Sequence, residues 1–181
     1  MLLLTQLDTT QRALVAERAL KARELAMACH SLKEWLKCYR EEMGGCPFLD
    51  EAGSCSVYSV RPLSCRSLLA TREASWCATD FSTLSATDRD IFLAGLDRRA
   101  VAFPTHYAAT PQEVGRELEE ATMRAETTTH GASVLGLLLY LIWLEDVHSL
   151  STRITTSVQD CIRYLEHHAL LNPYLILFET K

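Results

Sequence analysis

Apolar residues recur every three or four positions along the first part of the chain, which predicts helix from residue 8 to residue 43. Asp8 or Thr9 can cap its start, and neither Gly nor Pro interrupts the stretch that follows. The apolar face is formed by Leu14, Leu25, Ala28, Leu32, Trp35, Tyr39 and Met43. Ser31 and Glu34 match a capping box, so the region is either one helix or two helices with a break near His30.

A second helical region is predicted from residue 85 to residue 170. Ser85 starts a helix that reaches about Arg99, and Thr110 with Pro111 starts another that reaches about Ala125. Residues 127–131 are predicted as a loop, residues 132–146 as an apolar helix and residues 151–170 as the last helix. Because the apolar helix is shorter than the roughly 20 residues that cross a membrane, we expect a core helix and no membrane span.

Residues 46–77 lie between these regions and follow neither pattern. Gly44 and Gly45 end the first helical region, and the composition of residues 50–54 is typical of a turn, which predicts a short β-hairpin. Arg61 and Pro62 favour extended backbone before a further turn or helix start. The fold class is therefore mainly α: one helical domain, residues 1–181, with a central cysteine-rich irregular segment and a short β-hairpin.

Four of the seven cysteines fall in this irregular segment, at Cys46, Cys55, Cys65 and Cys77. Four thiolates can surround a zinc ion or hold an iron–sulfur cluster, and the alternative is two disulfides. No secretory signal is recognisable, so we expect the reducing cytoplasm, where clustered cysteines more often bind metal. Arg61 and Arg66 are candidates to offset the excess negative charge around such a site.

Composition and motifs exclude some functions. The formal net charge is −5 and no cluster of basic residues occurs, which argues against a nucleic-acid partner. We find no Gly-rich phosphate loop, no HExxH helix and no nucleophile with a nearby base, so no catalytic residue is assigned. Cys161 lies on the apolar face of the last helix and is expected in the core.

Three consecutive motifs in the irregular segment resemble a known family. They are Cys46–Asp50 (CPFLD), Gly53–Tyr58 (GSCSVY) and Arg61–Arg66 (RPLSCR). In order and spacing they are similar to the bacterial cysteine-cluster proteins that are described as zinc- or iron-chelating domains. The resemblance implies that Cys46, Cys55 and Cys65 are ligands of a metal or cluster, with Cys77 as the fourth.

The family is named for an amino-terminal CxxCxxCC motif, which this sequence lacks. Either the ligand set is reduced to the four downstream cysteines, or translation starts upstream of Met1, or Cys38 and Cys29 substitute. One continuous helix would direct Cys29 and Cys38 to opposite sides, where they could not share a metal.

Three functional hypotheses follow. The first is a metal-binding protein with a four-cysteine zinc or iron–sulfur site. The second is an iron–sulfur or open-site metalloenzyme that modifies a protein, since some related proteins are associated with flagellin lysine methylation. The third is a helical interaction module that binds a protein partner without metal.

Overall fold

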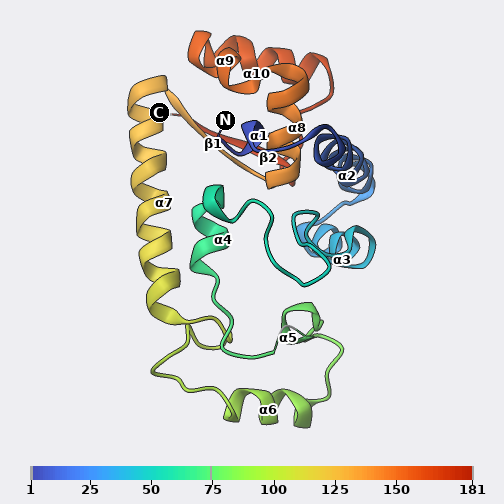
Figure 1. Ribbon diagram of the computed structural model, residues 1–181, viewed down its shortest axis with the longest axis vertical. Coiled ribbons are helices and arrows are strands. Elements are labelled where there is room, and N and C mark those ends of the chain that lie inside the picture. The colour runs from blue at the N-terminus through green and yellow to red at the C-terminus, as the bar shows by residue number, and fades with distance from the viewer. Residues whose placement is uncertain (1, 74, 181) are drawn as a thin grey trace. The chain divides into compact units, whose positions relative to one another are not determined.

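The computed structural model describes residues 2–73 and 75–180 and is mainly α, with a short antiparallel pair of strands (Figure 1). The chain divides into two compact units, the first made of Met1–Val60 with Met123–Lys181 and the second of Arg61–Thr122. The first unit contains α1 (Leu2–Thr5), α2 (Thr9–Ala28), α3 (Leu32–Met43), the 3₁₀ turn Tyr58–Val60, β1 (Ala132–Gly136), α8 (Leu138–His148), α9 (Leu150–Thr156), α10 (Val158–His167) and β2 (Ile176–Thr180). The second contains α4 (Leu63–Ser67), α5 (Ser75–Ala78) and α6 (Ala86–Ala94), and α7 (Ala109–His130) belongs to both.

The first helical region is broken near His30, as one of the two sequence interpretations proposed. Ser31 caps α3 by accepting from the Glu34 backbone N–H at 3.2 Å. The Glu34 carboxylate in turn accepts from the His30 backbone N–H at 2.8 Å, so two N–H groups that lack helical partners are satisfied. Gly44 then ends α3 with φ +65°, a backbone conformation that suits glycine.

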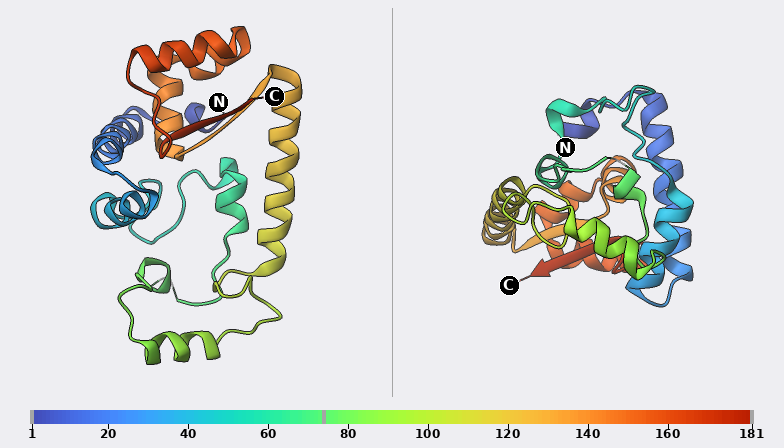
Figure 2. Two further views of the ribbon diagram at one scale, coloured as in Figure 1. Left: turned by 180° about the vertical axis from the view of Figure 1, so that it is seen from behind. Right: turned by 90° about the horizontal axis from the view of Figure 1, so that it is seen from below.

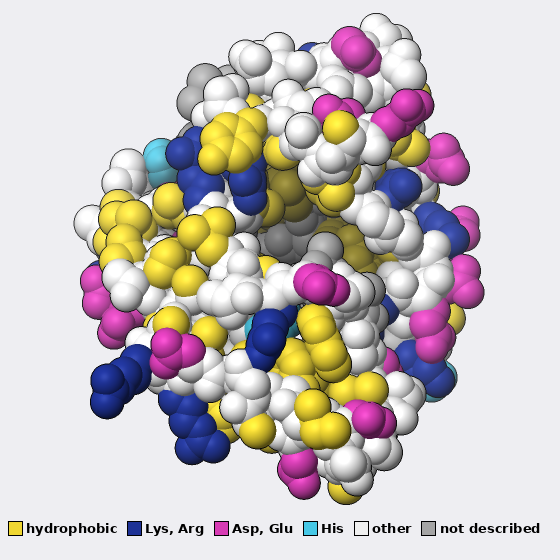
Figure 3. All heavy atoms as spheres, turned by 60° about the horizontal axis from the view of Figure 1, so that its bottom comes forward, with side chains coloured by type: hydrophobic (Ala, Val, Ile, Leu, Met, Phe, Trp, Pro, Cys, Tyr) yellow, Lys and Arg dark blue, Asp and Glu magenta, His cyan; other side chains and the backbone are white. Residues whose placement is uncertain are grey.

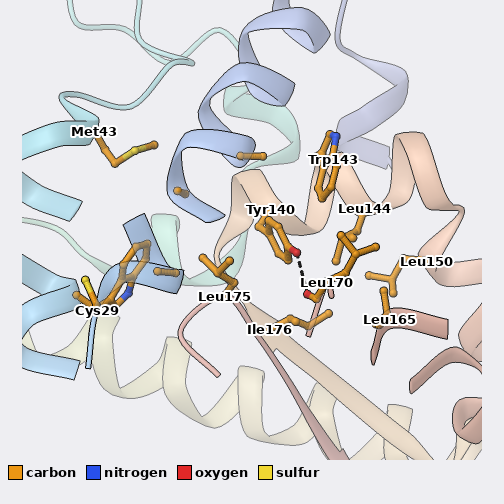
Figure 4. Packing of buried hydrophobic residues seen from close by; sticks show 14 of the residues in the cluster. Cys29, Met43, Tyr140, Trp143, Leu144, Leu150, Leu165, Leu170, Leu175 and Ile176 are labelled. Carbon is orange, nitrogen blue, oxygen red and sulfur yellow. Dashed lines mark hydrogen bonds between the residues drawn. The ribbon is translucent and has the colours of Figure 1, made fainter. Parts of the chain in front are cut away.

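The main core of the first unit is built around α8. Tyr140 and Leu144 on α8 are completely buried, and α8 packs on α2 through Ala19, Ala22 and Ala26, whose small side chains let the two helices approach closely. Leu165 from α10 and Leu175 next to β2 complete the cluster (Figure 4). The expectation of a core helix in this apolar stretch is confirmed.

The predicted helix of residues 132–146 is wrong at its start, because residues 132–136 form β1. This strand pairs antiparallel with β2, with Val134 opposite Phe178. Gly136 explains why the chain fits here, since a Cβ at this position would collide with the Leu175 carbonyl oxygen. A short apolar run fits a buried strand and a buried helix equally well, and only the pairing partner decided between them.

Three other boundaries differ from the predictions. Residues 127–130 are helical rather than a loop, because neither Gly nor Pro occurs between Gly115 and Gly131, where φ is +86°. The last helix is interrupted at Ser157, which caps α10 by accepting from the Asp160 N–H at 3.2 Å. The helix expected to reach Arg99 ends at Ala94, followed by the C-cap Gly95.

The second unit has a small aromatic core. Phe92, Leu96 and Val101 are buried, and Trp76 and Phe81 pack against them. Long connecting segments join α4, α5 and α6, drawn in green in Figure 2. Isolated antiparallel bridges, Ala70 with Tyr107 and Val101 with Ala108, tie these segments together.

No helix in the described ranges combines the length and apolar character needed to cross a membrane.

Candidate metal centre

Cys46 and Cys55 lie on the two arms of a tight turn in the first unit. The Asp50 N–H donates to the Ser54 carbonyl at 2.9 Å, and the Asp50 carboxylate accepts from the Ser54 N–H at 2.7 Å. An isolated antiparallel bridge joins Leu49 to Cys55. The hairpin expected here is therefore present as a hydrogen-bonded turn without extended strands, and the extended pair of the fold is β1 with β2.

Apolar residues anchor this turn. Phe48 and Val57 are buried, together with Leu3, Val15 and Leu139. Cys55 is half-buried and packs against this cluster, whereas Cys46 is exposed. The two thiols thus sit at the edge of a fixed turn, accessible enough to meet a ligand from outside.

Basic residues of α2 hold the arm that carries Cys46. The Arg18 guanidinium donates to the carbonyls of Met43, at 3.0 Å, and Gly45. Burial raises the pKa of Tyr39, the charge of the nearby Cys46 thiolate raises it further and the Arg18 guanidinium lowers it. Arg18 therefore brings positive charge close to Cys46. Sequence reasoning missed this residue, because within α2 it looks like any other solvated charge.

Cys29 and Cys38 are in contact in the first unit. The break between α2 and α3 turns α3 back, so the two side chains form a hydrogen bond and both pack in the main core. The pKa of Cys29 is raised by burial, then by the hydrogen bond and the charge of Cys38, and then by the charge of Glu34. One continuous helix would have directed Cys29 and Cys38 to opposite sides, but in this chain the break between α2 and α3 brings them together.

Cys65 lies in the second unit, on the short helix α4. Pro62 precedes this helix with an extended backbone, φ −54° and ψ 155°, as Arg61–Pro62 predicted. The Arg61 guanidinium donates to the Cys65 carbonyl, and Arg66 Nε donates to the Arg61 carbonyl at 3.0 Å. Both arginines thus hold the backbone of the turn that presents Cys65, which is half-buried.

The backbone of Cys77 belongs to α5, and its side chain lies outside the described part of the structure. Two of the four predicted ligands, Cys46 and Cys55, are in the first unit, and the other two are in the second. Within the described residues, no group of three or more Cys, His, Asp or Glu side chains is close enough to hold a metal ion. Convergence of the four sulfurs on one metal stays a prediction.

The chemistry of the described cysteines fits a thiophilic metal. The six whose side chains are described form no disulfide with one another, so they are thiols that can ionise and bind. Cys161 is buried in the core, as expected, and burial raises the pKa of its thiol. That environment favours the neutral thiol and makes Cys161 a packing residue.

Comparison with known proteins finds a match to one family model. Residues 7–83 match the model of the family described as CxxCxxCC, a putative zinc- or iron-chelating domain. No curated protein and no solved structure matches the chain. Six of the seven cysteines lie within the matched residues, and Cys161 lies outside them.

Proposed function

We propose, from the match of residues 7–83 to a zinc- or iron-chelating family, that this chain is a metal-binding protein whose site is formed by Cys46, Cys55, Cys65 and Cys77. The observation that carries the proposal is that all four cysteines lie in the matched residues, and that the three with described side chains, Cys46, Cys55 and Cys65, lie outside the main core cluster. The metal is zinc or the iron of an iron–sulfur cluster, because four thiolates suit both.

Two structural features support this ligand set. Cys46 and Cys65 each sit on a short turn whose backbone carbonyls accept hydrogen bonds from an arginine, Arg18 near the first and Arg61 at the second. Four thiolates around a divalent ion leave about two excess negative charges, which nearby guanidinium groups offset. Arginine stays protonated throughout the physiological range, so this compensation is permanent.

Metal binding would fix the irregular segment. Residues 46–77 contain few regular elements, and bound zinc can contribute on the order of 10–16 kcal/mol to the folding of such a segment at neutral pH. We place the protein in the reducing cytoplasm, where these thiols stay reduced and can bind metal. We also propose that it binds a protein partner.

Metal analysis of matched cysteine variants tests the proposal. The full chain is purified anaerobically, and its zinc, iron and visible absorption are measured beside those of Cys55→Ser, Cys65→Ser and Cys161→Ser. We expect about one equivalent of zinc, or a brown iron–sulfur protein, in the parent chain and in Cys161→Ser, and loss of most metal in the other two. A folded, metal-free parent chain contradicts the proposal and supports the interaction module.

The contact between Cys29 and Cys38 supports a variant of the proposed site in which these two cysteines also bind the metal. If these thiols are additional or substitute ligands, then Cys29→Ser and Cys38→Ser each lower the metal content as strongly as Cys55→Ser does. Unchanged metal in both variants restricts the site to the four downstream cysteines.

The metalloenzyme hypothesis requires a coordination position that no cysteine fills. An iron–sulfur or open-site metalloenzyme acting on a protein would therefore hold its metal with three protein ligands. Metal retained after Cys77→Ser, together with spectra that change when an exogenous thiol is added, supports an open site and hence that hypothesis.

A further inference from the structure

The second unit contains an aromatic cavity that the metal proposal does not use. Its volume is about 370 Å³, within the range of roughly 300–1,000 Å³ found for small-molecule pockets. Rings from four parts of this unit line it: Trp76 on α5, Phe81 after it, Phe92 on α6, and His106 with Tyr107 on the following loop.

The rings are packed against one another and form a fixed wall. The ring centroids of Trp76 and Phe92 are 4.6 Å apart, and those of Phe81 and Phe92 are 4.7 Å apart in an edge-on arrangement. His106 stacks on Tyr107 at 4.6 Å, and its carbonyl accepts from both the N–H and the hydroxyl of Thr71. Because Phe92 and His106 are buried, the wall is part of the folded unit and not a group of loose surface rings.

One permanent charge lies at this cavity. Arg89 is three and four residues before Phe92 and Leu93 on α6, so all three share one face of the helix and line the cavity. The side chain of Arg89 is exposed, and among the described residues no hydrogen bond or ion pair occupies its guanidinium. Asp and Glu are absent from the described lining.

The two threonine hydroxyl groups in the lining already have hydrogen-bond partners. Thr79 donates to the Ser75 carbonyl at 3.0 Å, and Thr105 donates to the Ala102 carbonyl at 2.6 Å. The Arg89 guanidinium carries a positive charge that no described hydrogen bond or ion pair occupies, so it favours an anion and disfavours a cation. On the face of the molecule in Figure 3, hydrophobic side chains reach the surface with Lys or Arg side chains beside them.

We propose that this cavity binds a small aromatic carboxylate, with its ring among Trp76, Phe81 and Phe92 and its carboxylate on Arg89. Offset and edge-on contacts hold a planar ring in a pocket of this kind. The planar guanidinium binds a carboxylate through two parallel N–H···O hydrogen bonds. The site is separate from the proposed ligand cysteines in function, and its test does not depend on metal content.

Calorimetry with three matched probes tests this site. The full chain is titrated with 3-phenylpropionate, with its neutral amide and with 3-phenylpropylamine, which differ in charge but share the ring. We expect the carboxylate to bind about tenfold more tightly than the amide, and the amine to bind most weakly.

Variants then locate the binding. Arg89→Gln should weaken carboxylate binding about tenfold and leave amide binding unchanged, because it removes the charge and keeps the rings. Arg99→Gln, an exposed arginine of the same unit outside the cavity, is the matched control and should bind like the parent chain. Thr105→Trp fills the cavity from an exposed position and should abolish binding of all three probes.

Three results overturn the proposal: no probe binds at millimolar concentration, the carboxylate and the amide bind equally, or Arg89→Gln and Arg99→Gln have the same effect. Circular dichroism of each variant shows whether the fold is retained. Since the substituted residues are exposed, loss of binding in a folded variant reports on the cavity itself.

Discussion

At the scale of single residues, the main core contains a buried hydroxyl group whose hydrogen bond is made within the protein. Tyr140 is completely buried on α8, and its hydroxyl donates to the Leu170 carbonyl at 2.8 Å, drawn as a dashed line in Figure 4. Burial raises the pKa of Tyr140 to about 12, so this hydroxyl stays neutral and keeps its proton at any physiological pH. The hydrogen bond joins α8 to the segment that follows α10 and gives the buried Leu170 carbonyl a donor.

Tyr140→Phe should therefore destabilise the chain by about 1–2 kcal/mol, because it leaves the Leu170 carbonyl buried without its donor. Urea unfolding followed by circular dichroism measures the change. Tyr174→Phe is the control, since the Tyr174 hydroxyl makes no hydrogen bond among the described residues. Equal stability of the two variants would show that the bond contributes nothing.

At the scale of elements, helix caps decide where the chain turns. The break between α2 and α3 is specified locally, by Ser31 and Glu34, yet its main consequence is tertiary: Cys29 meets Cys38. The apolar pattern predicts one helix over residues 151–170, but the cap at Ser157 separates α9 from α10. Ser, Asp and Asn compete with the helical backbone for hydrogen bonds, which explains why the same residues both start and interrupt helices.

Ser31→Ala should cost about 1 kcal/mol of stability, because the Glu34 N–H loses its acceptor at the first turn of α3. Hydrogen exchange at residues 32–35 should become faster in this variant. Lys33→Ala in the same turn removes an exposed side chain without a capping role and should leave exchange unchanged. Slow exchange in Ser31→Ala would mean that packing of Trp35 alone defines this helix start.

At the scale of the molecule, the first unit is held together by contacts between helices that are not predicted by any local pattern. His148 at the end of α8 hydrogen-bonds to the Tyr164 hydroxyl of α10 at 2.9 Å, and Arg153 of α9 lies 3.5 Å from the Tyr164 ring centroid. Burial lowers the pKa of His148, and the charges of His168 and Arg153 lower it further. The fold therefore favours the neutral imidazole.

Because the pKa of His148 is lower in the folded than in the unfolded chain, the stability it contributes is present above about pH 6.5 and is lost as the pH falls through the folded value. Urea midpoints at pH 7.5 and pH 5 measure this loss. His148→Asn should lose less stability on acidification than the parent chain, whereas His130→Asn, an exposed control, should behave like the parent. Identical pH dependence in all three would contradict the assignment.

The division into two units bears on the whole-molecule predictions. Cys46 and Cys55 belong to one unit, Cys65 and Cys77 to the other, and each unit has its own apolar cluster. Both the four-cysteine site and the single domain of residues 1–181 stay predictions, and metal content is the measurement that bears on them together.

The sequence by itself determined the features that depend on near neighbours. The mainly α class, the cap at Ser31, the turn around Asp50, the extended residues before α4 and the burial of Cys161 were all predictable, since periodicity, capping and turn chemistry act over a few residues. The family match agrees with the resemblance of the cysteine motifs, which is equally local.

Only the tertiary structure decided what depends on residues far apart in the chain. β1 became a strand because β2, more than thirty residues later, offers it a partner. Arg18 hydrogen-bonds to the Gly45 carbonyl, and Cys29 contacts Cys38. Trp76, Phe92 and His106 line one cavity. Each of these contacts forms through packing, which hydrophobic burial drives without regard to sequence distance. Such contacts leave no periodic signal, so the sequence pattern of the apolar run before α8 predicts helix and gives no indication of the cavity.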